Sequence, residues 1–422
     1  MRLVSLTLVL WSITLTFTAL TMLRMFPADH RQDIRNVVTG ESKSSNCYVT
    51  FGRCAPHFFV IGVFKGGTTS LYNYLGKHPQ VRLKIGNHTD RESGMKEVRT
   101  KETNFLTFFK FNQTTPTPTA PHLGMPKTVT QYLDTFFPRI YPGDGLITGE
   151  ASPSYVYAPD VADRMLQLFP RARLILMLRE PIDRAFSRVA HAAQLRCDRL
   201  PSDSNTNLPV PEYCQPEGVQ RLFDRLVELE LEGVETCLKQ VGLTLNAADE
   251  VVNSKDNIYQ QWNNAAQCWK KQTEQHKRQL SHPNPTMLPA SSAQFLRACL
   301  EMRTISHGLY IWQVLYWLRL FPREQLLIVR SEDFYADTVN VMTRIERHLH
   351  LQPNRIDWAD VVQVKYNVGI NRKDKSVAFI EEKAINNKKA QVSDKTRSKL
   401  QAFFQPYNQA LGALDLLQPW SY

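Results

Sequence analysis

Short apolar runs separated by helical patterns organise this chain, and the three clearest runs occupy residues 57–63, 172–178 and 325–330. Their aliphatic and β-branched side chains are typical of buried strands. One helical pattern opens at Leu71, another begins near Ile182, and a strongly amphipathic one covers Tyr310–Leu320. Strands that alternate with helices indicate an α/β fold, with a central parallel sheet flanked by helices on both faces.

The amino-terminal region has a different pattern. Residues 3–23 carry no charge and have an arginine on either side, so this run is long enough to cross a bilayer as an uncleaved anchor. A cleaved signal peptide is the alternative, but the run exceeds a usual signal core and lacks an Ala-x-Ala site. The chain is thus predicted to consist of an anchor (1–24), a polar stem (25–56) and one large domain (57–422). The large domain enters the secretory pathway whether residues 3–23 are an anchor or a cleaved signal peptide.

Two further features interrupt the regular alternation. Residues 197–303 are predicted to be an insertion, which opens with a loop rich in proline, serine and asparagine and continues as a helix over Leu222–Leu229. Near the carboxyl end, residues 400–408 predict a last helix. We expect Pro406 to interrupt or end it, because proline has no backbone N–H.

Composition adds a basic surface and an oxidising compartment. The 422 residues include 51 Lys and Arg against 40 Asp and Glu, a formal charge of +11. This balance favours anionic partners, such as phosphorylated nucleotides, acidic glycans or membrane surfaces. No arginine-rich tract or zinc-finger spacing is present, which disfavours nucleic acid. Seven cysteines without a CxxC pair argue against zinc and allow up to three disulfides with one thiol left over. Sequons at Asn87 and Asn112 agree with a secretory route.

The turn after the first apolar run carries the clearest chemical signal. Its sequence is Lys65-Gly66-Gly67-Thr68-Thr69-Ser70, and it leads directly into a helix. Glycines let the backbone approach an anion, while helix N–H groups, hydroxyls and the lysine supply donors. A Walker A loop places its lysine after the second glycine, whereas Lys65 precedes the glycine pair, so the nucleoside triphosphate signature is not met. A turn that serves only packing is the ordinary alternative.

Four other side chains could act with this loop. Arg179 ends the second predicted strand, at the edge where ligands collect in α/β sheets, and Ser187 lies two helical turns later. Together they could hold a second phosphate, although a strand-end salt bridge and a packing serine are the plain alternatives. Glu102 could accept a proton from a substrate hydroxyl. His191 is a second acid–base candidate, but an ordinary helix-face histidine is favoured.

Taken together, these segments resemble the Golgi carbohydrate sulfotransferases, which use 3′-phosphoadenosine 5′-phosphosulfate (PAPS). The resemblance runs in order from about residue 57 to 415 and rests on the segments 59–75, 101–105, 174–187, 308–325 and 400–408. Leu106 departs from the family pattern, which has a second phenylalanine there. The cysteine-bearing insertion is most similar to N-acetylgalactosamine 4-sulfate 6-O-sulfotransferases of the chondroitin branch, and heparan sulfate sulfotransferases come next. Heparan-type members often carry a lysine where this chain has Ala151, which disfavours that assignment.

The resemblance implies a P-loop-like fold and a membrane-anchored enzyme of the Golgi lumen that needs no metal. Such an enzyme would transfer a sulfuryl group from PAPS to a hydroxyl of an anionic glycan, of chondroitin or dermatan type. The roles implied are Lys65 at the bridging oxygen, Gly66, Gly67, Thr68, Thr69 and Ser70 around the 5′-phosphosulfate, Arg179 and Ser187 at the 3′-phosphate, Glu102 as base, and Asn371, Arg372 and Lys373 in a late basic loop over the nucleotide. A heparan sulfate-type sulfotransferase, a P-loop nucleotide kinase and a non-catalytic glycan-binding protein remain the alternatives.

Overall fold

The computed structural model describes residues 49–50, 53–83, 101–109, 126, 128–200, 210–243, 245, 258–281, 288–363, 390–418 and 420. Several sequence predictions concern other residues. These are the anchor over 3–23, the two sequons and the late basic residues Asn371, Arg372 and Lys373, all of which lie outside the described ranges. Within those ranges, no helix combines the length and the apolarity needed to cross a bilayer.

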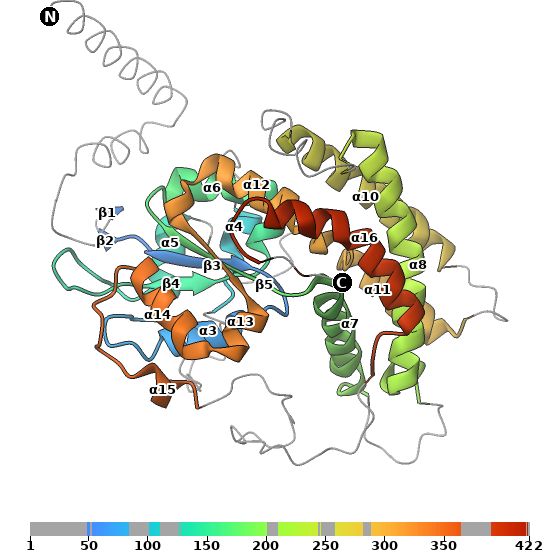
Figure 1. Cartoon of the computed structure of the whole chain (residues 1–422), viewed down its shortest axis with the longest axis horizontal. Coiled ribbons are helices and arrows are strands. Elements are labelled where there is room, and N and C mark those ends of the chain that lie inside the picture. The colour runs from blue at the N-terminus through green and yellow to red at the C-terminus, as the bar shows by residue number, and fades with distance from the viewer. Residues whose placement is uncertain are drawn as a thin grey trace, which may run out of the picture.

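Four parallel strands form the central sheet in the order β4-β3-β5-β6 (Figure 1). Three of them are the predicted strands, now bounded as β3 (Phe58–Gly62), β5 (Arg173–Leu178) and β6 (Leu326–Arg330). The fourth, β4 (Gly149–Ala151), has only three residues and no apolar run, so the hydrophobic pattern did not reveal it. A separate antiparallel pair, β1 (Val49–Thr50) and β2 (Arg53–Cys54), precedes the sheet.

Alternating side chains give the sheet two covered faces, which confirms the predicted α/β arrangement. Phe58, Val60 and Met177 belong to the core of one face, under α3 (Thr68–Leu75), α13 (Ser331–Ala336), α14 (Thr338–His348) and α15 (Trp358–Val361). Phe59 and Leu176 belong to the larger core of the other face. The helices nearest that face are α4 (Phe105–Phe108), α5 (Val129–Phe136), α6 (Pro159–Leu168) and α12 (Tyr310–Leu320) (Figure 1).

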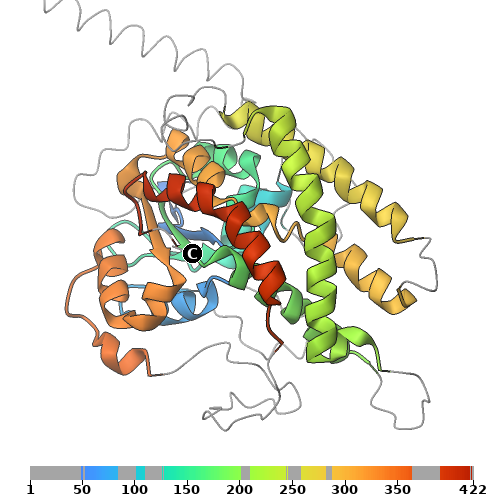
Figure 2. The ribbon, with the colours of Figure 1, turned by 45° about the vertical axis from the view of Figure 1, so that its right-hand side comes forward.

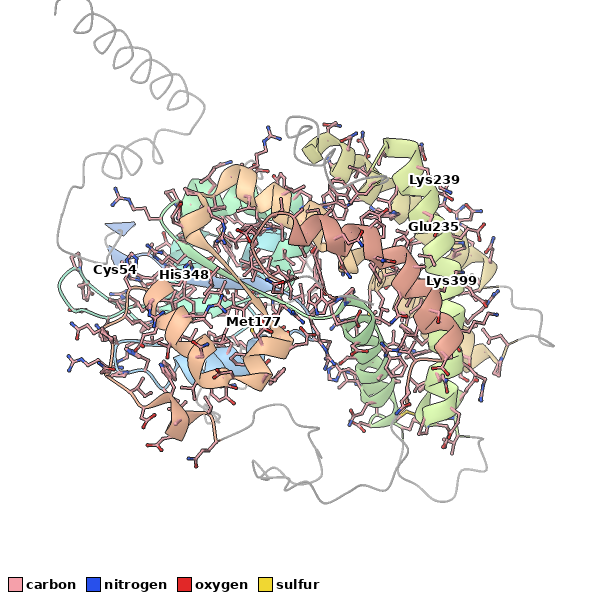
Figure 3. All side chains as sticks on the ribbon, in the orientation of Figure 1. Cys54, Met177, Glu235, Lys239, His348 and Lys399 are labelled. Atoms are coloured by element: carbon pink, nitrogen blue, oxygen red, sulfur yellow. A yellow bond between two sulfur atoms is a disulfide. The ribbon has the colours of Figure 1, made fainter. Side chains whose placement is uncertain are left out.

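The region predicted as an insertion forms a helical layer beside the sheet. It contains α8 (Pro216–Val241), α10 (Ile258–Gln279) and α11 (Ala290–Glu301), which lie next to α7 (Pro181–Cys197) and α16 (Asp394–Gly412) (Figure 2). Glu235 and Lys239 of α8 and Lys399 of α16 are on the same side of the molecule, far from Cys54 (Figure 3). Short 3-10 turns at Tyr155–Tyr157, Glu212–Cys214, Ser306–Gly308 and Arg323–Gln325 connect these elements.

Disulfides strengthen this layer, as the cysteine count led us to expect. Cys197 is bonded to Cys214 at the end of α7, and Cys237 of α8 is bonded to Cys268 of α10. Cys54 is disulfide-bonded as well, and Cys299 is a buried free thiol.

Two expectations about helices were wrong. Pro406 lies inside α16, which continues to Gly412, because Phe404, Tyr407 and Leu411 on either side of the proline are buried and hold the helix against its neighbours. The helix α12 has the predicted bounds but is not amphipathic in its surroundings: every residue from Tyr310 to Trp317 is buried, since α6 and α16 both pack against it.

Candidate active site

The glycine-rich turn lies where β3 ends and α3 begins, as predicted. The Val63 amide donates to the carbonyl of Met177 at 2.8 Å, and the Gly66 amide donates to the carbonyl of Val63 at 3.0 Å. Met177, on β5, is seen near the middle of the molecule in Figure 3. The hydroxyl of Ser331 donates to the carbonyl of Gly66 at 2.7 Å, so the start of α13 fixes the turn from the other side.

Both glycines of the turn are required by its geometry. A Cβ atom on Gly66 would lie 2.9 Å from the carbonyl oxygen of Met177, which is backbone and cannot move aside. Gly67 has φ +88° in the left-handed region, and a Cβ atom there would lie 2.8 Å from the hydroxyl of Tyr335. The turn therefore needs both glycines, and it leads directly into the first amides of α3, an arrangement that can collect a phosphate group.

Two cations flank the turn. Lys65 has φ 67°, which is unusual for a residue other than glycine, and its carbonyl accepts a 3.2 Å hydrogen bond from Nη1 of Arg179. Burial lowers the pKa of Lys65, and the positive charges of Arg179 and Arg188 lower it further. The structure thus brings the predicted Lys65 and Arg179 together at the carboxyl edge of the sheet.

Glu102 reaches the same turn through its neighbour Lys101. The Nζ atom of Lys101 lies 2.8 Å from Oε1 of Glu102 and donates to the hydroxyls of Thr69 at 2.8 Å and Thr68 at 3.4 Å. Burial lowers the pKa of Lys101, and the adjacent carboxylate of Glu102 opposes that shift. One ammonium group therefore joins the predicted base to the predicted anion-binding hydroxyls. Lys101 belongs to one of the segments that carry the resemblance but had no predicted role, because only the tertiary structure shows its contacts.

A buried carboxyl group on β4 supports the Lys101–Glu102 segment. Glu150 accepts a 2.6 Å hydrogen bond from the hydroxyl of Tyr155 and is also within 3.4 Å of the hydroxyl of Ser152. Ser152 in turn accepts from the Asn104 amide at 3.0 Å, and the Ala151 amide donates to the carbonyl of Lys101 at 3.0 Å. Burial raises the pKa of Glu150 to about 7, although the hydrogen bonds to it act in the opposite direction. Glu150 and Tyr155 had no predicted role, because only the tertiary structure brings their partners together.

The start of α7 is tied to the site from two directions. The carbonyl of Arg179 accepts a 2.7 Å hydrogen bond from the hydroxyl of Tyr310 on α12. Glu180 caps α7 by accepting from the amides of Ile182 at 3.1 Å and Asp183 at 2.6 Å. Ser187 is half-buried two turns further along α7, while His191 is exposed on the same helix.

The assembled site can bind and activate anions. It combines helix-terminal amides and threonine hydroxyls with three cations, Lys65, Lys101 and Arg179. The carboxylate of Glu102 lies beside Lys101. These donors fit a phosphate-like ligand because the amides and hydroxyls supply hydrogen bonds and the cations supply charge. In the described part of the chain, no group of three or more histidine, cysteine, aspartate or glutamate side chains is arranged to hold a metal ion.

Comparisons with known proteins find one matching family model and several similar proteins. Residues 56–204 match the model of the sulfotransferase family. The chain is 25% identical to the membrane-associated sulfotransferase kil1 of Dictyostelium discoideum over 73% of this chain and 58% of that protein. It is 24% identical to carbohydrate sulfotransferase 15 of Homo sapiens over 71% of this chain and 45% of that protein. A shorter match, 31% identical over 32% of this chain and 13% of the other, is to the bifunctional heparan sulfate N-deacetylase/N-sulfotransferase 4 of Mus musculus. The chain spans about half the length of the first two relatives.

Proposed function

We propose that this chain, which carries a sulfotransferase-family domain over residues 56–204, transfers a sulfuryl group from PAPS to a hydroxyl group of an anionic glycan. The observation that carries the proposal is the contact of Lys101 with both Glu102 and the hydroxyl of Thr69, at 2.8 Å each. This contact supports the proposal because a direct transfer between two bound substrates requires the base for the acceptor to lie beside the residues that bind the donor.

On the donor side, the predicted residues of the turn and of α7 divide the tasks. The amides at the start of α3 and the hydroxyls of Thr68 and Thr69 bind the 5′-phosphosulfate. Lys65 stabilises the negative charge that develops on the bridging oxygen as the S–O bond to the phosphate breaks. Arg179 binds the 3′-phosphate with its guanidinium fork, with Ser187 as an additional donor from α7, and adenosine 3′,5′-bisphosphate leaves.

On the acceptor side, Glu102 removes the proton of the attacking hydroxyl while the new S–O bond forms. Lys101 keeps this carboxylate at the edge of the donor loop, and the network around Glu150 keeps Lys101 in place. The proton ends on Glu102 and is lost to solvent after the products leave. As in phosphoryl transfer, the protein contributes mainly position and charge.

The acceptor and the compartment belong to the same proposal. The likeness to carbohydrate sulfotransferase 15 over 71% of this chain supports a carbohydrate acceptor, and we propose a chondroitin- or dermatan-type glycan. The likeness to a heparan sulfate N-sulfotransferase supports heparan sulfate as a second candidate, although it covers only 32% of this chain. The disulfides of the helical layer support an oxidising compartment, and we propose the Golgi lumen, with residues 3–23 as the membrane anchor.

The test is transfer of radiolabelled sulfate from PAPS to chondroitin, dermatan, heparan and simple sugar acceptors by the purified chain. We expect transfer by the wild type and at least a 100-fold loss in Lys65→Ala, the size expected when a transition-state charge contact is removed. Lys77→Ala is the matched control, because Lys77 is exposed just after α3. Full activity in Lys65→Ala would refute the assigned mechanism. Magnesium-dependent ATP hydrolysis without sulfate transfer would instead support a nucleotide kinase or ATPase.

A further inference from the structure

A second arginine of α7, Arg188, lies against the residue that precedes Lys65. The central carbon of its guanidinium is 4.2 Å from the ring centroid of Phe64. Phe64 is held in turn by Tyr157, whose hydroxyl accepts from the Phe64 amide at 3.3 Å and whose ring stacks on that of Phe64 at 5.8 Å. Tyr157 stacks on His307 at 3.8 Å. Arg188 therefore rests on a fixed aromatic platform at the end of β3.

The charges around Arg188 are of both signs. Burial lowers its pKa, and the nearby Arg184 acts in the same direction, while Tyr157 and Glu102 oppose the shift. Glu102 is the carboxylate in this group, and it is already paired with Lys101 at 2.8 Å. Within the described part of the chain, Arg188 itself forms no ion pair. A bound anion would stabilise a partly desolvated guanidinium in such a setting.

Arg188 leaves α7 in a different direction from its neighbour Ser187, the proposed 3′-phosphate contact. Successive residues of an α-helix point about 100° apart, and the Arg188 guanidinium is instead placed over the ring of Phe64. The 5′-phosphosulfate already has the loop amides, the threonine hydroxyls and Lys65 as partners. What remains is the side of the site that faces Glu102, where the acceptor hydroxyl must be when it loses its proton.

We propose that Arg188 binds an oxyanion group of the acceptor, a carboxylate or a sulfate ester that lies close to the hydroxyl receiving the sulfuryl group. This inference rests on the proposed function and adds a residue that selects anionic acceptors. The planar guanidinium can donate two parallel hydrogen bonds to such a group, and the Phe64 ring holds its plane in one orientation.

The test measures acceptor binding in the presence of adenosine 3′,5′-bisphosphate, so that it does not depend on turnover. The probes are unsulfated chondroitin oligosaccharides, their 4-sulfated form and a neutral, carboxyl-reduced form of the unsulfated ones. The variants are Arg188→Gln and Arg188→Lys. Arg196→Gln is the matched control, since Arg196 lies further along α7 with its guanidinium 5.6 Å from the ring of Phe295.

We expect Arg188→Gln to weaken binding of the anionic acceptor by about 10- to 100-fold, as for loss of a charge-assisted contact. Binding of the neutral acceptor and of the bisphosphate should stay within threefold, and Arg188→Lys should recover part of the loss. If Arg188→Gln weakens binding of both the unsulfated and the 4-sulfated oligosaccharides, the group that Arg188 binds is a carboxylate. If it weakens binding of the 4-sulfated oligosaccharide alone, the group is a sulfate ester. Equal losses on charged and neutral probes, or no loss, would overturn the inference while the proposed function stands. If the wild type transfers no sulfate in the assay above, the proposed function fails and this inference with it.

Discussion

Replacing Lys101 by methionine tests the link between the two halves of the site. The methionine keeps a long apolar side chain but removes the ammonium group that lies 2.8 Å from both Glu102 and the hydroxyl of Thr69. The Lys101 side chain is 18% exposed, so its contacts are poorly screened by water. The Glu102 side chain is 34% exposed and stays solvated after the change.

The expected effect follows from those two contacts. The hydrogen bond from the charged ammonium to Thr69 contributes about 1.5–3 kcal/mol, and the partly exposed ion pair with Glu102 contributes about 0.5–1 kcal/mol, so the loss of both raises the barrier by about 2–4 kcal/mol. We therefore expect kcat/KM for sulfate transfer to fall roughly 30- to 1,000-fold in Lys101→Met. Thermal stability should change little, because an apolar side chain replaces a buried charge.

The assay is steady-state sulfate transfer with PAPS and the best acceptor, alongside the melting temperature of each protein. Lys101→Arg keeps the charge and should retain more activity than Lys101→Met. Lys77→Met is the control for the loss of an exposed lysine near α3. If Lys101→Met keeps kcat/KM within threefold of the wild type, Lys101 does not couple the base to the donor loop, and our reasoning is wrong.

Three more predictions concern the base, the buried carboxyl group and the turn. Glu102→Gln should lower kcat at least 100-fold and leave binding of adenosine 3′,5′-bisphosphate unchanged, as measured by calorimetry; unchanged turnover would assign the base to another group. Because the pKa of Glu150 is raised to about 7, the folded state keeps a proton that the unfolded chain loses at lower pH. This carboxyl group therefore destabilises the fold increasingly as pH rises from about 4.5 through about 7. Glu150→Gln should therefore gain melting temperature relative to the wild type between about pH 5 and about pH 8, and a constant difference across that range would contradict the shift. Gly67→Ala should weaken bisphosphate binding about tenfold through the left-handed φ of 88° and the close Tyr335 hydroxyl, whereas Gly143→Ala, with φ 97° and no atom within 4 Å, should affect stability alone; equal binding losses in both variants would show that the turn has no special role.

Local pattern was sufficient for the parts of the fold that have strong local signals. The strands β3, β5 and β6 are continuous apolar runs, and the glycine turn has a composition that few other structures need. Because ligands collect at the carboxyl edge of a parallel sheet, Arg179 could be predicted at that edge. In the structure its guanidinium lies 3.2 Å from the carbonyl oxygen of Lys65, while the roles of both side chains stay predictions.

The missed features depend on contacts between segments distant in sequence. β4 is three residues long and is held by pairing with β3, so its own sequence carries no period. Lys101 looks like a surface lysine until it is seen beside Thr69, 32 positions away in sequence. Arg188 becomes a candidate site residue only through its contact with Phe64, which lies in the turn after β3. Pro406 was misjudged because burial of its neighbours outweighs one missing backbone hydrogen bond.

The most direct test of the central claim is the binding of two nucleotides by the purified chain, measured by calorimetry. The account predicts that adenosine 3′,5′-bisphosphate binds at least tenfold more tightly than adenosine 5′-monophosphate, because Arg179 contributes a charge-assisted contact to the 3′-phosphate. It also predicts that Arg179→Ala removes this preference. Equal affinity of the wild type for the two nucleotides would contradict the account.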